Sequence, residues 1–142
     1  MTIDSKEFRE KAMAGRCELL KSLSFLNRQQ GTGSAGTAYE VGQEAYKEGF
    51  AAEVKTPKGG LYDSWVKSGK IPAWAARAVA SLLRKREDYS PRSQEELWSL
   101  LLMLAEGYDI TEVSGLRTLV SGCAVDDEVL QLAIDSKKAS YN

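Results

Sequence analysis

The sequence contains no histidine, and that absence excludes more kinds of chemistry than any residue present suggests. Without imidazole there is no Ser-His or Cys-His nucleophile pair, most catalytic zinc sites are excluded and the commonest general base at neutral pH is missing, so an enzyme would have to use carboxylates or lysines alone. The acids Glu95 with Glu96, and Asp126 with Asp127 and Glu128, stand where helices are expected to begin, and negative charge there complements the helix dipole. The sequence therefore predicts a protein that is not an enzyme, with no metal site and no cofactor.

Cysteine is scarce and long apolar runs are absent. Cys17 and Cys123 stand far apart in apolar surroundings and form no C-x-x-C pair, which predicts reduced thiols in a core rather than a disulfide framework. No apolar run reaches the length of a membrane span, and the N-terminus lacks the pattern of a signal peptide. We therefore expect a cytoplasmic protein with no membrane association, and its 142 residues suit a single domain.

No segment shows a convincing strand alternation, whereas apolar residues recur with the helical period of about 3.6. This pattern predicts an all-α fold, a compact bundle of five to seven short helices. Asp4 with Glu7 forms a capping box for a first helix ending near Gln30, and Thr37 with Glu40 forms one for a second helix ending near Glu53. Further helices are expected before Gly69, from Pro72, from Ser93 to Gly107, from Asp109 to Gly122 and from about Asp126 to Lys138.

The segment Gly31 to Gly36 spells G-x-G-x-x-G, the pattern of dinucleotide-binding turns. Here it follows a predicted helix rather than a strand, and no βαβ unit surrounds it. A flexible loop is the favoured interpretation, because glycine and serine leave the backbone free and bury little surface.

Charge is strongly segregated along the chain. Residues 54–92 hold nine Lys/Arg against three Asp/Glu, while residues 93–142 hold three against nine. A local excess of positive charge attracts phosphates, and the acidic part would repel them or bind a basic partner. The basic segment therefore makes nucleic-acid binding, and duplex DNA in particular, the first functional hypothesis.

The helix expected from Pro72 carries one apolar stripe and one unusual polar face. Trp74, Arg77, Ser81, Arg84 and Lys85 share that face at helical spacing. Such a strip suits a phosphate backbone, because guanidinium groups bind phosphate with two hydrogen bonds and indole stacks on sugar or base. The alternative is that Trp74 packs in the core or in an oligomer interface while the cations form an ordinary solvated face.

The segment Leu97 to Leu104 is apolar nearly all round the expected helix. A helix of this kind must be covered on most sides, either by the rest of the domain or by another copy. Because a small domain has few sides to offer, we expect a homodimer.

Residues 50–86 resemble lambda-repressor-like helix-turn-helix proteins of the phage Cro and repressor type. The resemblance rests on Leu61-Tyr-Asp-Ser-Trp-Val-Lys-Ser-Gly-Lys-Ile-Pro72 followed by an alanine-rich helix. It implies that Trp65, Ile71 and Pro72 are scaffold residues. It also implies that one group of side chains lies toward the major groove and that Lys70 lies near a phosphate. That group is Lys58, Tyr62, Asp63 and Lys67.

Two functions remain open from the sequence. The first is a small phage- or plasmid-type DNA-binding transcriptional regulator, in which Arg77, Arg84 and Lys85 add phosphate contacts. The second is a phage-type inhibitor or adaptor that docks on a host protein, possibly a nucleic-acid enzyme. The two differ in salt response, because phosphate contacts weaken steeply with salt and a packed protein interface weakens much less.

Overall fold

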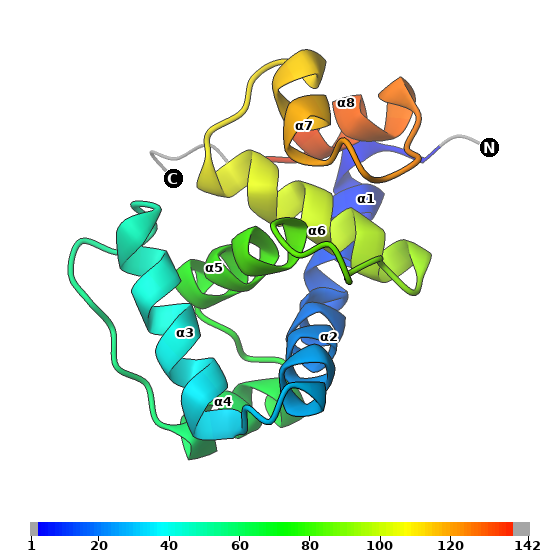
Figure 1. Ribbon diagram of the computed structural model, residues 1–142. Coiled ribbons are helices and arrows are strands. Elements are labelled where there is room, and N and C mark those ends of the chain that lie inside the picture. The colour runs from blue at the N-terminus through cyan, green and yellow to red at the C-terminus, as the bar shows by residue number, and fades with distance from the viewer. Residues whose placement is uncertain (1–2, 138–142) are drawn as a thin grey trace. The chain divides into compact units, whose positions relative to one another are not determined.

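The computed structural model describes residues 3–137, and every regular element among them is an α-helix, as predicted (Figure 1). The helices are α1 (Ser5–Ala14), α2 (Arg16–Gln29), α3 (Ser34–Lys47), α4 (Gly59–Ser68), α5 (Ala73–Arg84), α6 (Gln94–Gly107), α7 (Val113–Leu119) and α8 (Asp127–Asp135). The first predicted helix is present as two, divided at Gly15, where a Cβ would lie 2.4 Å from the carbonyl oxygen of Glu95. Within residues 3–137 no helix has both the length and the apolar character needed to cross a bilayer.

The chain divides into two compact units. Unit 1 comprises the residues up to Gly15 and those from Ser90 onward, with α1, α6, α7 and α8, and unit 2 comprises Arg16–Tyr89, with α2 to α5. The sequence of unit 1 holds seven Lys/Arg and twelve Asp/Glu, a net charge of −5, whereas unit 2 holds twelve and eight, a net charge of +4. The charge segregation read from the sequence thus follows the boundary between the units.

Unit 1 is built around α6, against which α1, α7 and α8 pack. The rings of Phe8 on α1 and Trp98 on α6 stack with centroids 4.7 Å apart. The helices predicted to begin at Asp4 and Ser93 are capped there, because the side chain of Asp4 accepts the backbone amide of Glu7 and that of Ser93 accepts the backbone amide of Glu96. The helix predicted from Asp109 to Gly122 is shorter, since α7 begins at Val113 and ends at Leu119. The last helix, α8, ends at Asp135, and Lys138 of its predicted range lies outside the described residues.

The apolar surround of α6 is buried within a single chain. Leu100 to Leu104 are at most 2% exposed, and Trp98 and Ala105 are buried as well. We expected a homodimer because a small domain was expected to leave part of this helix uncovered. Since one chain covers the helix, this argument for a dimer no longer applies.

Unit 2 consists of α2 to α5, with α3 packed on both α4 and α5 (Figure 1). Its second helix differs from prediction, because α3 begins at Ser34 and ends at Lys47 rather than running from Thr37 to Glu53. Thr37 is not the cap of α3. It lies buried inside the helix, where its hydroxyl accepts a hydrogen bond of 3.0 Å from the side-chain amide of Asn27. The predicted flexible loop is therefore shorter, and its last residues start α3.

Candidate nucleic-acid interface

The inner side of α4 is fixed by two aromatic residues. Tyr62 is fully buried and its hydroxyl donates a hydrogen bond of 2.8 Å to the carbonyl of Leu20 on α2. Trp65 is 5% exposed and meets Trp74 of α5 edge-on, with ring centroids 5.7 Å apart. The ammonium of Lys55 lies 5.9 Å from the Trp74 ring centroid, a cation–π distance. α4 is thus tied to α2, to α5 and to the segment that precedes it.

The start of α4 lies directly against the start of α3. A Cβ on Gly59 would lie 2.8 Å from the backbone nitrogen of Ala35, and the hydroxyl of Ser34 donates to Asp63 at 2.8 Å. The connection between the helices, residues 48–58, returns along α3, where a Cβ on Gly42 would lie 1.9 Å from the carbonyl oxygen of Lys55 (Figure 1). Two glycines therefore allow backbone to pack on backbone.

This returning connection differs from a helix-turn-helix, in which about three or four residues join the two helices. Here the end of α3 and the start of α4 are separated by residues 48–58, so that α3 and α4 begin side by side. The part of the motif after α4 does follow the expectation: Gly69 adopts a left-handed conformation (φ 75°) and its amide bonds to the carbonyl of Trp65. Ile71 is buried just before α5 begins at Ala73.

The outer side of α4 is broad, exposed and made mainly of short side chains. Its exposed residues are Gly60, Leu61, Asp63, Ser64, Lys67 and Ser68. Lys58 stands exposed immediately before the helix and Lys70 immediately after its glycine cap. We call this set, from Lys58 to Lys70, the α4 face. Within the part of the chain that the structure describes, Lys58, Lys67 and Lys70 form no ion pair.

The predicted groove-facing residues separate into three cases. Lys58, Lys67 and Lys70 are exposed, the first just before α4, the second in its last turn and the third just after its glycine cap. Asp63 is exposed on that face, but its carboxylate accepts the hydrogen bond from Ser34 at the start of α3. The prediction that Tyr62 lies toward base edges is wrong, because its ring is the buried anchor of the helix.

The predicted strip on α5 is not an open row of cations. Ser81 is fully buried and donates to Glu44 of α3 at 2.7 Å, and Lys85 binds the same carboxylate at 2.6 Å and Glu48 at 3.4 Å. Arg77 and Arg84 are half-buried, with their Nε atoms fully buried. The prediction of a continuous exposed strip is therefore wrong, because a carboxylate on α3, distant in sequence, binds two of its residues.

Two exposed tyrosines were missed as surface residues. The helical period of α3 alone did not single out Tyr39 and Tyr46, which are 61% and 52% exposed. They lie on either side of Gly42 along one helix face, at spacings of three and four residues. The glycine between them was the sequence signal for this exposure, because it lets the returning connection, rather than another helix, pack on that face.

The described residues contain no group of side chains arranged to hold a metal ion. Comparison with known proteins adds no assignment: no protein family, no curated protein and no solved structure matches this chain.

Proposed function

We propose that the chain is a small DNA-binding transcriptional regulator that contacts duplex DNA through the α4 face of unit 2. The observation that carries the proposal is the group of three exposed lysines, Lys58, Lys67 and Lys70, free of ion pairs within residues 3–137 and held on one anchored helix. Unpaired exposed cations give the strongest attraction for phosphates, because no internal acid competes for them.

The dimensions of α4 suit a groove. An α-helix with its side chains is about 10–12 Å across, and the major groove of B-form DNA is about 12 Å wide; the ten residues of α4 give it a length of about 15 Å. Gly60, Ser64 and Ser68 have short side chains, which permit a close approach, and the serine hydroxyls donate and accept hydrogen bonds. In this arrangement Lys58 and Lys70, one at each end, bind the flanking phosphates and Lys67 points to base edges or phosphate.

The test is a measurement of affinity for a short fluorescent duplex as a function of salt. The triple variant Lys58→Ala, Lys67→Ala, Lys70→Ala should flatten the slope of log affinity against log salt by about two to three units, because each lost phosphate contact contributes about 0.9 and two or three such contacts are removed. The matched control is Lys6→Ala, Arg28→Ala, Lys47→Ala, which removes the same charge from exposed cations outside the α4 face that also form no ion pair within residues 3–137. Equal losses in both triples would mean that net charge alone attracts DNA. A folded wild type without affinity at low salt would end the proposal.

A second candidate function is an inhibitor or adaptor that docks on another protein. The observation that favours it is the exposure of Tyr39 and Tyr46, because large exposed aromatics mark protein interfaces. Under this function the triple lysine variant leaves binding nearly unchanged, and Tyr39→Ala with Tyr46→Ala removes it.

A further inference from the structure

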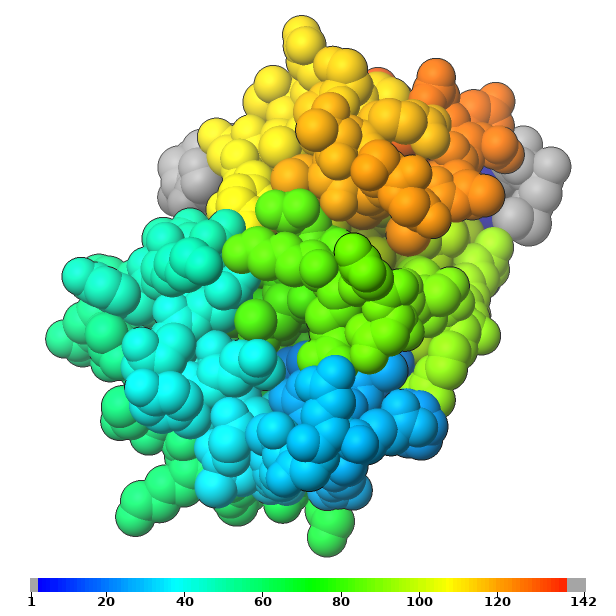
Figure 2. Space-filling view, in the orientation of Figure 1, coloured from blue at the N-terminus to red at the C-terminus, as the bar shows by residue number. Residues whose placement is uncertain are grey.

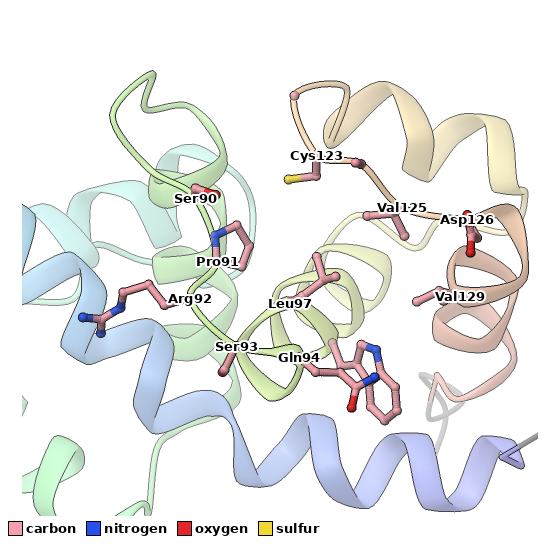
Figure 3. A pocket seen from close by; sticks show the side chains of 13 residues that line it. Ser90, Pro91, Arg92, Ser93, Gln94, Leu97, Cys123, Val125, Asp126 and Val129 are labelled. Atoms are coloured by element: carbon pink, nitrogen blue, oxygen red, sulfur yellow. The ribbon is translucent and has the colours of Figure 1, made fainter. Parts of the chain in front are cut away.

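The open groove of unit 1 does not specify an occupant. It has a volume of about 750 Å³, and the first turns of α6 form its floor, with Leu97 between Pro91 and Val125 (Figure 3). Its lining holds one acid, Asp126, and one cation, Arg92, so neither sign of charge predominates. A surface with a more specific chemistry lies in unit 2, on the α4 face.

The α4 face carries one large apolar side chain, that of Leu61, which is 47% exposed. Gly60 precedes it and Ser64 follows one turn later, and both have short side chains. The helix itself is held by the buried rings of Tyr62 and Trp65, so Leu61 is presented from an anchored element. In Figure 2 green side chains project from the lower edge of unit 2, where Figure 1 places α4.

The major groove of duplex DNA contains one apolar group that suits such a side chain. The base edges there present hydrogen-bond donors and acceptors, and thymine alone adds a methyl group, at C5. Leucine gains from contact with this group, because the contact removes apolar surface on both sides from water. Leu61 also lies between Lys58, just before the helix, and Lys67, in its last turn, so cations suited to phosphates flank it along α4.

We infer that Leu61 is a specificity-determining residue, which contacts the 5-methyl group of a thymine and makes the chain prefer duplexes with thymine at one position. This inference rests on the proposed function and extends it, because phosphate contacts alone carry no sequence information. The contact should be worth about three- to fivefold in affinity, the effect of burying about one methyl or methylene group.

Replacement of thymine by deoxyuridine tests the contact, because it removes the 5-methyl group and retains both hydrogen bonds of the base pair. Selection by the wild-type chain from a pool of random duplexes supplies a preferred duplex, whose thymines are then replaced one at a time. Affinity of the wild type should fall about three- to fivefold at a single thymine and stay the same at the others. Leu61→Ala should bind the original duplex and the duplex altered at that thymine with equal affinity.

Two further variants serve as controls. Leu61→Met keeps a large apolar side chain and should retain the preference for the methyl group. Val54→Ala shortens another exposed apolar side chain of unit 2, outside the α4 face, and should respond to deoxyuridine like the wild type. Melting curves establish that each variant is folded. The salt slope of Leu61→Ala should equal that of the wild type, because no phosphate contact is removed.

The outcomes separate this inference from the DNA-binding proposal. A wild type that binds DNA with steep salt dependence, but responds to no replacement of thymine by deoxyuridine, overturns the role of Leu61 and leaves the proposed function in place. The same holds if Leu61→Ala responds to deoxyuridine like the wild type, or if selection returns no preferred sequence. A folded wild type without affinity for DNA at low salt ends both.

Discussion

The hydroxyl of Tyr62 donates a hydrogen bond of 2.8 Å to the carbonyl of Leu20, and this bond joins the inner side of α4 to α2 at a fully buried position. Burial is the largest cause that raises the pKa of Tyr62 above its ordinary value of 10.0, because a phenolate in this position would lose its hydration. The bond requires the neutral phenol, which is the donor. The attachment of α4 to α2 therefore depends on protonation of the Tyr62 hydroxyl.

Alkaline pH should destabilise the protein through Tyr62. The folded pKa is raised above the unfolded value, so this contribution to stability is complete below about pH 10 and is lost as pH rises further. Denaturant unfolding between pH 9 and 12 measures the loss. In Tyr62→Phe the slope of stability against pH should become shallower, while stability at neutral pH falls by about 0.5–1.5 kcal/mol because one buried hydrogen bond is lost. An unchanged slope would mean that the phenolate is accommodated.

The glycines at the helix crossings should be far less replaceable than a neighbouring glycine in open space. A Cβ on Gly42 would meet the Lys55 carbonyl oxygen at 1.9 Å, so Gly42→Ala must displace backbone and should destabilise by about 2 kcal/mol or more. Gly60 has no neighbour within 4 Å of its Cβ position and is helical, so Gly60→Ala should stabilise by about 0.5–1 kcal/mol. Thermal melting of the two variants compares them directly. Equal effects would contradict the packing of residues 48–58 on α3.

Local rules were enough to predict the helices of this chain and several of their ends. The N-cap bonds of Asp4 and Ser93 act within one turn, and Gly69 ends α4 because glycine adopts the left-handed conformation without strain. The periodicity in α6 likewise predicts its nearly complete burial. Such signals lie within a few residues of the structure that they determine.

The site required information from distant parts of the chain. Periodicity alone does not decide which side of α4 is buried, and that choice follows from the return of residues 48–58 along α3 at Gly42 and Gly59. Ser81 and Lys85 look like surface residues in sequence, but Glu44, on another helix, binds both. Tyr62 was placed on the wrong side for the same reason, whereas Lys58 and Lys67 are exposed and their groove-facing role stays a prediction.

Lys85 should affect folding more than nucleic-acid binding. It lies 2.6 Å from the carboxylate of Glu44, a side chain that is 7% exposed. Lys85→Ala removes a cation that compensates the negative charge of this buried carboxylate, and it should destabilise the fold by about 1–3 kcal/mol. Lys47→Ala removes an exposed cation of α3 without an ion pair in the described chain and should change stability by less than about 0.5 kcal/mol. If Lys85→Ala instead weakened DNA binding with unfolding unchanged, Lys85 would be a phosphate ligand.

Asp63 provides a test of how α4 meets nucleic acid, because it is the one acid on the α4 face. Its carboxylate accepts from Ser34, and an asparagine oxygen accepts the same bond, so Asp63→Asn should leave the fold nearly unchanged. If the helix approaches phosphates, removing this negative charge should raise affinity about two- to fivefold, an effect typical of one exposed charge interaction. Asp88→Asn is the matched control: Asp88 is an exposed acid of unit 2 outside α4, whose hydrogen bond with Arg86 lowers its pKa. Titration of a labelled duplex measures both variants. A fall in affinity on one preferred sequence for Asp63→Asn, with Asp88→Asn unchanged, would show that the charge of Asp63 helps to recognise that sequence and would contradict the expected approach to phosphate.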